Sequence, residues 1–306
     1  MPASQLTNTV IMVSPNHFGF NPETAESNVF QHHVSDSEEE IQSKALAEFN
    51  GVVNKLKEQG INVLILESRD DAITPDAIFP NNWFSHHSDG RLVIYPMLAP
   101  NRRAERQTIK LKDLLTENKI TVSEIIDLTE DENSGKFLEG TGSLVLDREN
   151  KVAYAMESPR TNHEEFNKWC EMMDYKGVFF HAYDKEGFAI YHTNVTMSVG
   201  KEYAVICLDS IKNPEEKQLV KSSLENAGKE IIELSVDQIY KYCGNTLQVI
   251  SSDGSPKIIM SKTAQNGFNA EQLEKLKSHG EIISVEIPEI EIVGGGSARC
   301  MLAEVF

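Results

Sequence analysis

The chain has 306 residues, of which 40% are hydrophobic and 25% charged, as expected for a globular protein that buries a substantial core. Its formal net charge of −18 argues against a nucleic-acid or anionic-membrane partner, because such partners attract clustered lysine and arginine. The first residues, MPASQLTNTV, carry no recognisable secretory signal and no apolar run is long enough to cross a bilayer, so we expect a soluble, cytoplasmic protein.

The first expected element is a strand at residues 8–15, followed by a helix at 38–59 that opens with a Ser/Asp cap and an acidic first turn. Helical periodicity recurs at residues 102–118, 162–174, 213–227 and 269–279. Each helix is followed by a short β-rich run, and each of the first four runs is followed by a hairpin. The predicted hairpin turns are Ser88-Asp89-Gly90, DREN, Gly200 and SDGS.

This order is a helix–strand–hairpin module that occurs five times, and the fifth hairpin lacks its second strand. The unpartnered strand at residues 8–15 can supply it, which would close the modules into a ring and remove exposed sheet edges. No Pro/Ser-rich linker or shift in composition divides the chain. We therefore expect an α/β fold in one domain, residues 1–306, closed by pairing of the first strand with the last.

Five residues stand where the first strand of each hairpin begins: Asn82, Glu139, His192, Asn245 and Cys300. They recur at intervals of 53 to 57 residues, so equivalent modules would bring all five to one end of the ring axis. A set of apolar β-formers would be the ordinary content of such positions. The polar and nucleophilic types found here predict an active site at the axis.

Cys300 follows GGGSAR, and glycines permit close backbone approach while successive N–H groups can stabilise a developing negative charge. A nucleophilic thiol needs a base, for which His192 is the candidate, with Glu139 orienting the imidazole or binding a substrate N–H. Asn194 lies two residues beyond His192, so on a strand it would share that face.

Ordinary readings compete with this hypothesis, because a lone cysteine is more often a small buried hydrophobe and a glycine run can be a plain loop. Cys170 and Cys207 fit the core, and Cys243 ends a helix. The four cysteines suggest no disulfide framework, and the absence of a CxxC pair argues against structural zinc. The neighbouring pairs His32-His33 and His86-His87 would each present one ligand per strand face, so a metal site is not indicated.

Four motifs in order resemble the pentein superfamily of guanidino-group-modifying, amidinotransferase-related enzymes: FLEGTGSLVL, YHTNVTMSVG, CGNTLQV and GGGSARCML. The resemblance covers essentially the whole chain. It implies an α/β propeller of five ββαβ-type modules around a pseudo-fivefold axis. It also implies that Cys300 attacks the substrate's central carbon and that His192 protonates the leaving nitrogen and then activates water. Glu139 would bind substrate nitrogen and His192, and no metal or organic cofactor would be needed.

The sequence departs from the arginine-processing members at two positions where they carry aspartates. Asn82 (or Asn81) and Asn194 stand there, so the site would favour a neutral ureido group, whose carbonyl and NH₂ match an amide's donor and acceptor. The implied reaction resembles that of citrulline utilisation hydrolases, citrulline to ornithine, carbon dioxide and ammonia. Asn245, in the Gly-Asn segment, is a further expected substrate contact.

Two alternatives stay open. A deiminase, dihydrolase or amidinotransferase would act on a guanidino substrate, with Glu139 and another acid such as Asp76 supplying the charge; a non-catalytic pentein ring would only bind. An amino-acid substrate such as citrulline or arginine needs a cation for its α-carboxylate, and the candidates are Arg102, Arg103 and Arg299. The oligomeric state stays open, with a homodimer as one candidate.

Overall fold

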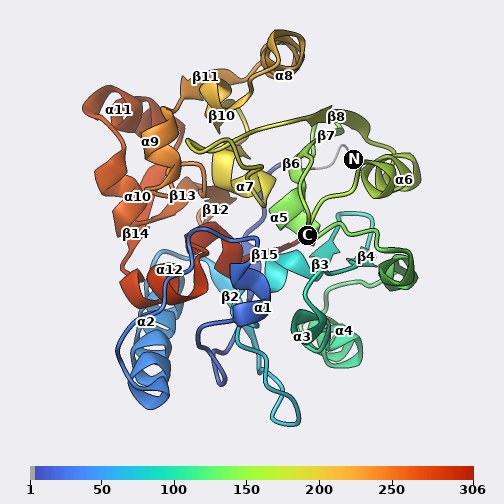
Figure 1. Cartoon of the computed structure of the whole chain (residues 1–306), viewed down its shortest axis with the longest axis vertical. Coiled ribbons are helices and arrows are strands. Elements are labelled where there is room, and N and C mark those ends of the chain that lie inside the picture. Colours follow the sequence, from blue (N-terminus) through green and yellow to red (C-terminus); the bar gives the residue numbers. More distant parts are fainter. Residues whose placement is uncertain (1–3) are drawn as a thin grey trace.

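The computed structural model describes residues 4–306, which form five three-stranded sheets around a central axis with the longer helices outside them (Figure 1). In each of four modules a hairpin is followed by a helix and then by a strand parallel to the second hairpin strand. Their strands are β3 (Phe84–His86), β4 (Arg91–Ile94) and β5 (Glu124–Asp127); β6 (Val145–Asp147), β7 (Val152–Met156) and β8 (Lys176–Phe180); β9 (Met197–Val199), β10 (Tyr203–Ile206) and β11 (Glu230–Glu233); β12 (Leu247–Ile250), β13 (Pro256–Ser261) and β14 (Glu281–Val285).

The fifth module joins the two ends of the chain. β1 (Thr9–Val13) pairs antiparallel with β15 (Ala303–Val305) and parallel with β2 (Asn62–Leu66). Thr9 lies opposite Val305 on one side and opposite Asn62 on the other. The predicted pairing of the first strand with the last is therefore confirmed, and the architecture is the expected five-module α/β fold.

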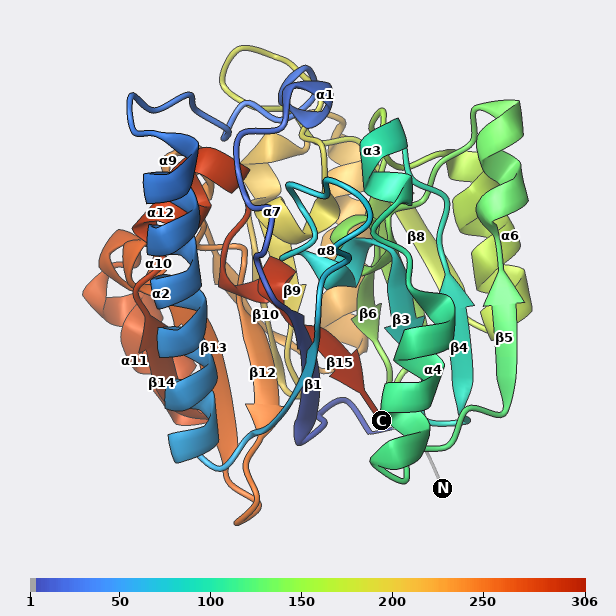
Figure 2. The same cartoon turned by 90° about the horizontal axis from the view of Figure 1, so that it is seen from below.

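The connecting helices lie on the outside of the sheets (Figures 1 and 2). α2 begins with a capping box between Ser37 and Glu40, and it buries an apolar face that includes Ile41, Ala45 and Phe49. The others are amphipathic in the same way, and their apolar faces fill the space against the sheets. The five helices are α2 (Glu38–Glu58), α4 (Thr108–Glu117), α6 (His163–Met173), α8 (Pro214–Asn226) and α11 (Ala270–His279).

The helix predicted at residues 102–118 is wrong in its first part. The chain forms α3 (Pro100–Arg103), turns, and begins α4 only at Thr108. The break follows from the arginines, because the side chains of Arg103 and Arg106 turn back onto the carbonyl groups of Met97 and Tyr95.

Short helical turns stand at the inner ends of the hairpins. α5 (Gly140–Ser143) precedes β6, α7 (Thr193–Thr196) precedes β9, and single 3-10 turns cover Pro80–Asn82 and Ala298–Met301. Asn194 therefore lies on a helical turn and not, as predicted, on a strand face shared with His192. The remaining short helices are α1 (Pro22–Ala25), α9 (Val236–Ile239), α10 (Lys262–Gly267) and α12 (Pro288–Gly294).

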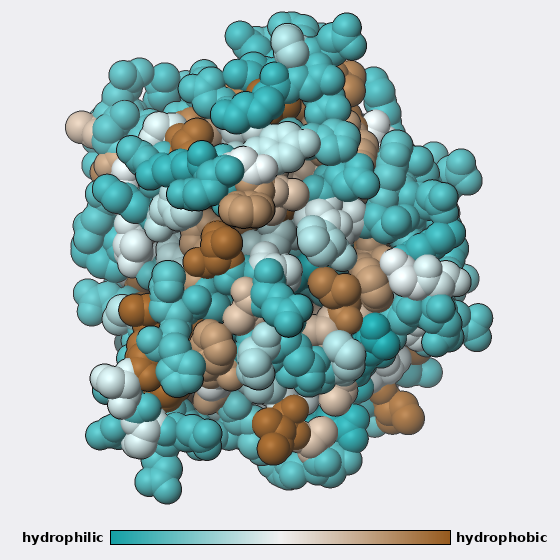
Figure 3. All heavy atoms as spheres, viewed as in Figure 1, coloured by the Kyte–Doolittle hydropathy of each residue, from teal (hydrophilic) through white to brown (hydrophobic). Residues whose placement is uncertain are grey.

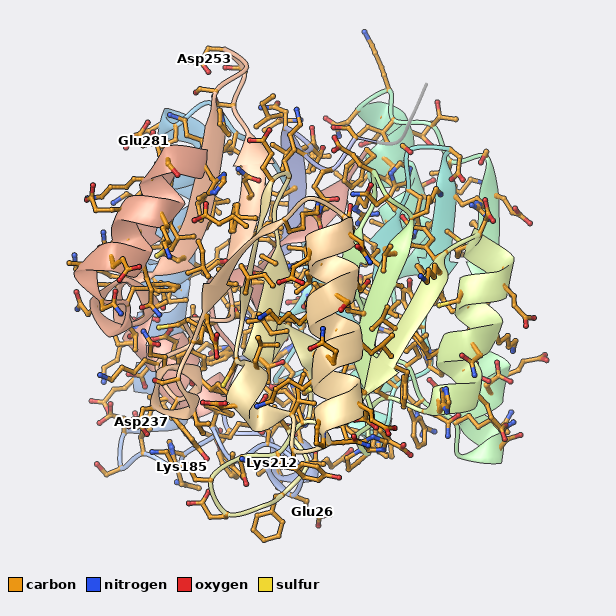
Figure 4. The ribbon with its side chains drawn as sticks, turned by 90° about the horizontal axis from the view of Figure 1, so that it is seen from above. Glu26, Lys185, Lys212, Asp237, Asp253 and Glu281 are labelled. Carbon is orange, nitrogen blue, oxygen red and sulfur yellow. The ribbon has the colours of Figure 1, made fainter. Side chains whose placement is uncertain are left out.

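Polar side chains cover most of the surface seen in Figure 3, with apolar atoms scattered among them, in keeping with the net charge of −18. Within residues 4–306, no helix is both long and apolar enough to span a bilayer. Figure 4 shows the two ends of the ring from the side: Glu26, just after α1, marks one end, and Asp253, in the β12–β13 turn, marks the other.

A fully buried ion pair joins two neighbouring modules. Lys229 Nζ lies 3.1 Å from Asp147 Oδ2 and also donates to the carbonyl oxygens of Gly200 and Lys201. Both charged side chains are at most 1% exposed. Removing one partner of such a pair strands the other charge in the interior.

We predict that Lys229→Met lowers the free energy of unfolding by about 3–5 kcal/mol, because Asp147 is left buried and unpaired. Urea unfolding at pH 7 measures this. The double variant Lys229→Met/Asp147→Asn, which removes both charges, should recover part of the loss. A single variant that unfolds within about 1 kcal/mol of the parent would contradict the prediction.

Candidate active site

The five ring positions converge as the spacing predicts. Each lies within the few residues that precede the first strand of its hairpin, in or beside the short turn there, and each is at most 4% exposed. His192 Nε2 is 2.9 Å from Glu139 Oε2, and Asn245 Nδ2 is 3.3 Å from Cys300 Sγ. Asn82 lines the same pocket as His192 and Cys300. Residues from five parts of the chain therefore form one buried cluster.

The turn that carries Cys300 is fixed by its own backbone and by Asn245. Cys300 N donates to Ser297 O (2.9 Å), and Arg299 N donates to Asn245 Oδ1 (3.0 Å). The side-chain amides of Asn245 and Asn194 then point their nitrogens at Cys300 Sγ, at 3.3 and 3.6 Å. Donors aimed at the sulfur stabilise a thiolate, which is the nucleophilic form of cysteine.

Two glycines in the GGGS run pack directly against Phe79. A Cβ atom on Gly294 or Gly296 would meet the Phe79 ring at 2.8 Å, closer than real side chains tolerate. Gly295 has φ +64, in the left-handed region that favours glycine. The glycine run therefore serves close backbone packing, as its sequence suggested.

The His192–Glu139 pair has a defined protonation state at neutral pH. Burial lowers the pKa of His192 to about 4, against the opposing effect of Glu139. Burial alone would raise the pKa of Glu139, but Arg160, the bond from His192 and Arg102 together lower it to about 2. A carboxylate only accepts hydrogen bonds, so Nε2–H of the neutral imidazole donates to Glu139 and Nδ1 is the basic nitrogen.

Gly142 allows the imidazole to reach this position. A Cβ atom there would lie 2.8 Å from the His192 ring and 2.4 Å from Asn82 Nδ2. Gly142, the second glycine of FLEGTGS, is therefore required for steric reasons, because the side chains of His192 and Asn82 occupy the space that a larger residue would need.

A small pocket lies over the cluster on the α1 side of the ring, and Thr24 of α1 forms part of its wall. Its polar lining combines acids, cations and amides: Asp76, Asn82, Arg102, Arg160, His192 and Cys300. Across residues 4–306, no group of three or more potential ligating side chains could hold a metal ion.

The three arginines predicted to bind a carboxylate lie in different places. Arg102 lines the pocket and is fully buried, bonded to Glu105, Asn82 and two backbone carbonyls. Arg103 lies outside this pocket, with its guanidinium on the carbonyls of Met97 and Leu98. Of these three candidates, only Arg102 lines the pocket.

Arg299, although adjacent to Cys300, points to the other end of the ring. It bonds Leu302 O and Glu304 and lines a second cavity there, together with Asn194. Arg299 therefore does not line the pocket that contains Cys300, because neighbouring residues of the 3-10 turn point in different directions.

The four asparagines predicted to bind substrate also lie in different places. Asn82 lines the pocket, whereas Asn81 is buried beside it without lining it. Asn194 and Asn245 contact the sulfur of Cys300 rather than the pocket wall. Asp76, named in the sequence only as an alternative acid, lines the pocket with Asn82.

Sequence reasoning missed Arg160. Its guanidinium stacks over Tyr191 at 4.9 Å, donates to Thr24 O and Ser27 Oγ, and places Nη1 3.6 Å from Glu139 Oε2. No sequence motif indicates a functional role for Arg160, which follows β7 in the segment ESPRTN. Its partners lie far away in the chain, so only the fold brings them together.

The fold and this constellation define an enzyme of the pentein superfamily, whose members modify guanidino groups. Residues 14–306 match the family described as N,N dimethylarginine dimethylhydrolase, eukaryotic, and the chain belongs to that family. Among curated proteins, none matches the sequence.

Solved structures share the fold at low identity. The product-bound N-terminal domain of ArgZ, an arginine dihydrolase from the ornithine–ammonia cycle in cyanobacteria, superposes with a TM-score of 0.73 at 18% identity, covering 97% of each chain. Full-length ArgZ gives 0.72 at 18% identity, and the match covers 96% of this chain but 40% of ArgZ. DDAH from Pseudomonas aeruginosa, a cysteine-to-serine mutant complexed with citrulline, gives 0.65 at 15% identity, covering 97% and 98%.

The lowered pKa of His192 predicts that its imidazole stays neutral down to about pH 5 and titrates near 4. NMR of the imidazole nitrogens measures this directly. Glu139→Gln should move the titration to still lower pH, because Glu139 raises the pKa of His192 against the effect of burial.

His181 is the internal control. Burial is the largest single effect and lowers its pKa, but the bonds and charges from Glu216 and Glu157 together outweigh it, so the pKa is raised and His181 should titrate above 6.5 in the same spectra. If His192 titrated together with His181, the assignment of a neutral buried base would be wrong.

Proposed function

We propose that this protein hydrolyses the ureido group of an amino acid, with L-citrulline as substrate and ornithine, carbon dioxide and ammonia as products. The reaction passes through a covalent adduct on Cys300. Family membership supports a hydrolase that acts on guanidino-type C–N bonds. The choice of a neutral ureido group over a guanidinium depends on the orientation of one side chain, Asn82.

Arg102 fixes the way in which the Asn82 amide points. Its Nη1 is 2.8 Å from Asn82 Oδ1, and because a guanidinium can only donate, the amide oxygen must face Arg102. Asn82 Nδ2 is then the atom left over, and it has no hydrogen-bond partner within residues 4–306. Asn82 therefore offers the pocket a donor. A ureido oxygen can accept from it, whereas every nitrogen of a guanidinium is itself a donor.

Asn194 lines the second cavity rather than the pocket, but it reaches Cys300 and carries the complementary group there. Its Nδ2 is directed at Cys300 Sγ, and its Oδ1 is buried with no partner in the described part of the chain. An unmet buried acceptor costs roughly 1–3 kcal/mol, so a ligand that fills it gains that amount. The NH₂ of a ureido group is a suitable donor for this oxygen.

The proposed chemistry begins with attack of Cys300 Sγ on the ureido carbon while His192 takes the thiol proton. His192 then delivers that proton to the substrate nitrogen as the C–N bond breaks, which releases ornithine and leaves a carbamoyl group on the sulfur. Water, deprotonated by His192, attacks this thiocarbamate, the C–S bond breaks with the Cys300 thiolate as leaving group, and His192 returns the proton to the sulfur. The carbamate that is released decomposes to carbon dioxide and ammonia. Glu139 holds the imidazole in the required tautomer throughout.

The amino-acid end of the substrate would be held by charge. Arg160 has an Nη1 group with no hydrogen bond to the rest of residues 4–306, apart from the ion-pair contact with Glu139, and it suits an α-carboxylate. Asp76 has one oxygen bonded to Asn21 and Thr24 and the other, Oδ1, without a partner in the described residues. That oxygen suits an α-ammonium group.

The second candidate is hydrolysis of arginine or a related guanidino compound. The free Oδ1 of Asp76 favours it, since a carboxylate in the pocket could instead face a guanidinium. The family match and the likeness to an arginine dihydrolase support the same reading. The two candidates differ in what the free oxygen of Asp76 binds. In citrulline hydrolysis it binds the α-ammonium group, and in arginine hydrolysis it binds the guanidinium.

Purified protein incubated separately with L-citrulline and L-arginine distinguishes them. We expect ornithine and ammonia from citrulline, no turnover of arginine, and complete loss of activity in Cys300→Ala. Mass spectrometry would identify the trapped intermediate, because a carbamoyl group on the sulfur makes the Cys300 peptide about 43 Da heavier. Turnover of arginine alone would overturn the ureido assignment while keeping the nucleophile.

Asn82→Asp tests the observation on which the assignment depends. It replaces the donor facing the pocket with an acceptor, so citrulline turnover should fall by roughly tenfold to a thousandfold, as for loss of one oriented donor. The ratio of arginine to citrulline activity should rise. A variant that keeps the parent's selectivity would show that Asn82 does not read the head group.

Arg160→Gln should raise KM for citrulline by at least about tenfold, because a desolvated charge contact is lost. N-Carbamoylputrescine, which lacks the α-carboxylate, should show a far smaller change in KM. Arg103→Gln, at an arginine outside the pocket, is the matched control and should leave both substrates unaffected. Equal effects on the two substrates would remove Arg160 from carboxylate binding.

A further inference from the structure

We propose that Glu291 is a positioning residue that sets the place of Cys300 by holding Ser297. This role builds on the proposed function, since it assumes that Cys300 is the nucleophile. Glu291 lies on α12 and is 5% exposed. Its Oε1 accepts from Ser297 Oγ at 2.6 Å, and its Oε2 accepts from Thr263 Oγ1 at 2.5 Å.

Ser297 transmits this anchoring to the nucleophile. It stands at the start of the 3-10 turn Ala298–Met301, and its carbonyl oxygen accepts the N–H of Cys300 at 2.9 Å. With the hydroxyl held by Glu291, the carbonyl of the same residue has a fixed position. The far side of the turn is held by Asn245, which bonds Arg299 N and Cys300 Sγ. Glu291 and Asn245 thus hold the turn from opposite sides.

The helix beneath is itself anchored, which makes Glu291 a firm point of attachment. Tyr242 Oη donates to Glu291 O, and Tyr191 Oη donates to the carbonyl of Gly295. Glu48, from α2, accepts from the backbone N–H groups of Glu289 and Ile290 at the start of α12. The bond to Glu291 therefore ties the Ser297 side chain to a helix that is itself held in place.

A carboxylate at this site is costly, because burial disfavours its charge and raises the pKa of Glu291. Hydroxyl groups of Ser261, Ser297 and Thr263 offset that cost, and those of Ser297 and Thr263 donate to the two carboxylate oxygens. The two differ in what they reach: Ser297 belongs to the nucleophile turn, whereas Thr263 belongs to α10. They therefore provide a matched pair for separating a positioning role from a structural one.

The test compares Ser297→Ala, Thr263→Val, Glu291→Leu and Glu291→Gln. Misplacing a reacting group by a fraction of an ångström to one ångström costs up to roughly a hundredfold in rate, so we expect kcat for citrulline to fall roughly tenfold to a hundredfold in Ser297→Ala and Glu291→Leu, with KM little changed. Thr263→Val should lower the melting temperature but keep kcat. Glu291→Gln, whose carbonyl can still accept from Ser297, should retain more activity than Glu291→Leu.

The double variant Glu291→Leu/Ser297→Ala should be no slower than the poorer single variant, because both changes remove one interaction. Fully additive losses would mean that the two residues act separately and would overturn the proposal. So would a Ser297→Ala protein with the parent's kcat, or a Thr263→Val protein as impaired as Ser297→Ala.

A readout that does not depend on the substrate separates this proposal from the proposed function. Iodoacetamide labelling of the Cys300 peptide, followed by mass spectrometry at pH 7, should slow in Ser297→Ala and Glu291→Leu, because the sulfur loses the donors from Asn245 and Asn194. Thr263→Val should label like the parent. If the parent turns over neither citrulline nor arginine while labelling separates the variants in this way, the positioning role stands and the proposed function falls.

Discussion

The carboxylate of Glu139 is buried at the axis of the ring, and burying that charge is costly unless it is paired and hydrogen-bonded. One oxygen accepts from Leu98 N and the other from His192 Nε2, while Arg160 and Arg102 place guanidinium nitrogens at 3.6 and 3.9 Å. These partners come from different modules. The charge is therefore stabilised only when the modules surround the axis, so folding and assembly of the site depend on the same contacts.

Charge compensation also shapes what the pocket can accept. Arg102 is held by Glu105 through Nε and Nη2, and its remaining reach goes to Asn82 and the backbone. The guanidinium that balances the buried acids is thus the group that orients the Asn82 amide. In this structure, one side chain both stabilises the interior and sets the orientation of a pocket amide, and a change at Arg102 would disturb both.

Much of the fold could be predicted because its signals are local. Caps, apolar periodicity and turn residues place α2, α6, α8 and α11 within a residue or two of their observed ends, and they place all four hairpins. The errors fall where distant contacts override local preference. α4 begins late because arginines turn onto backbone carbonyls, and Asn194 leaves the strand for a helical turn that brings its amide to Cys300.

The sequence by itself determined which residue types meet at the axis and in which order, because a repeated module places equivalent residues at equal intervals along the chain. Asn82, Glu139, His192, Asn245 and Cys300 could be named on that ground alone. Only the tertiary structure decided which cations face the pocket and which way each amide points. Arg160 reaches Ser27 across 133 residues, and Asn82 is oriented by Arg102. Contacts of that kind leave no local periodicity, since they depend on how separate modules pack together.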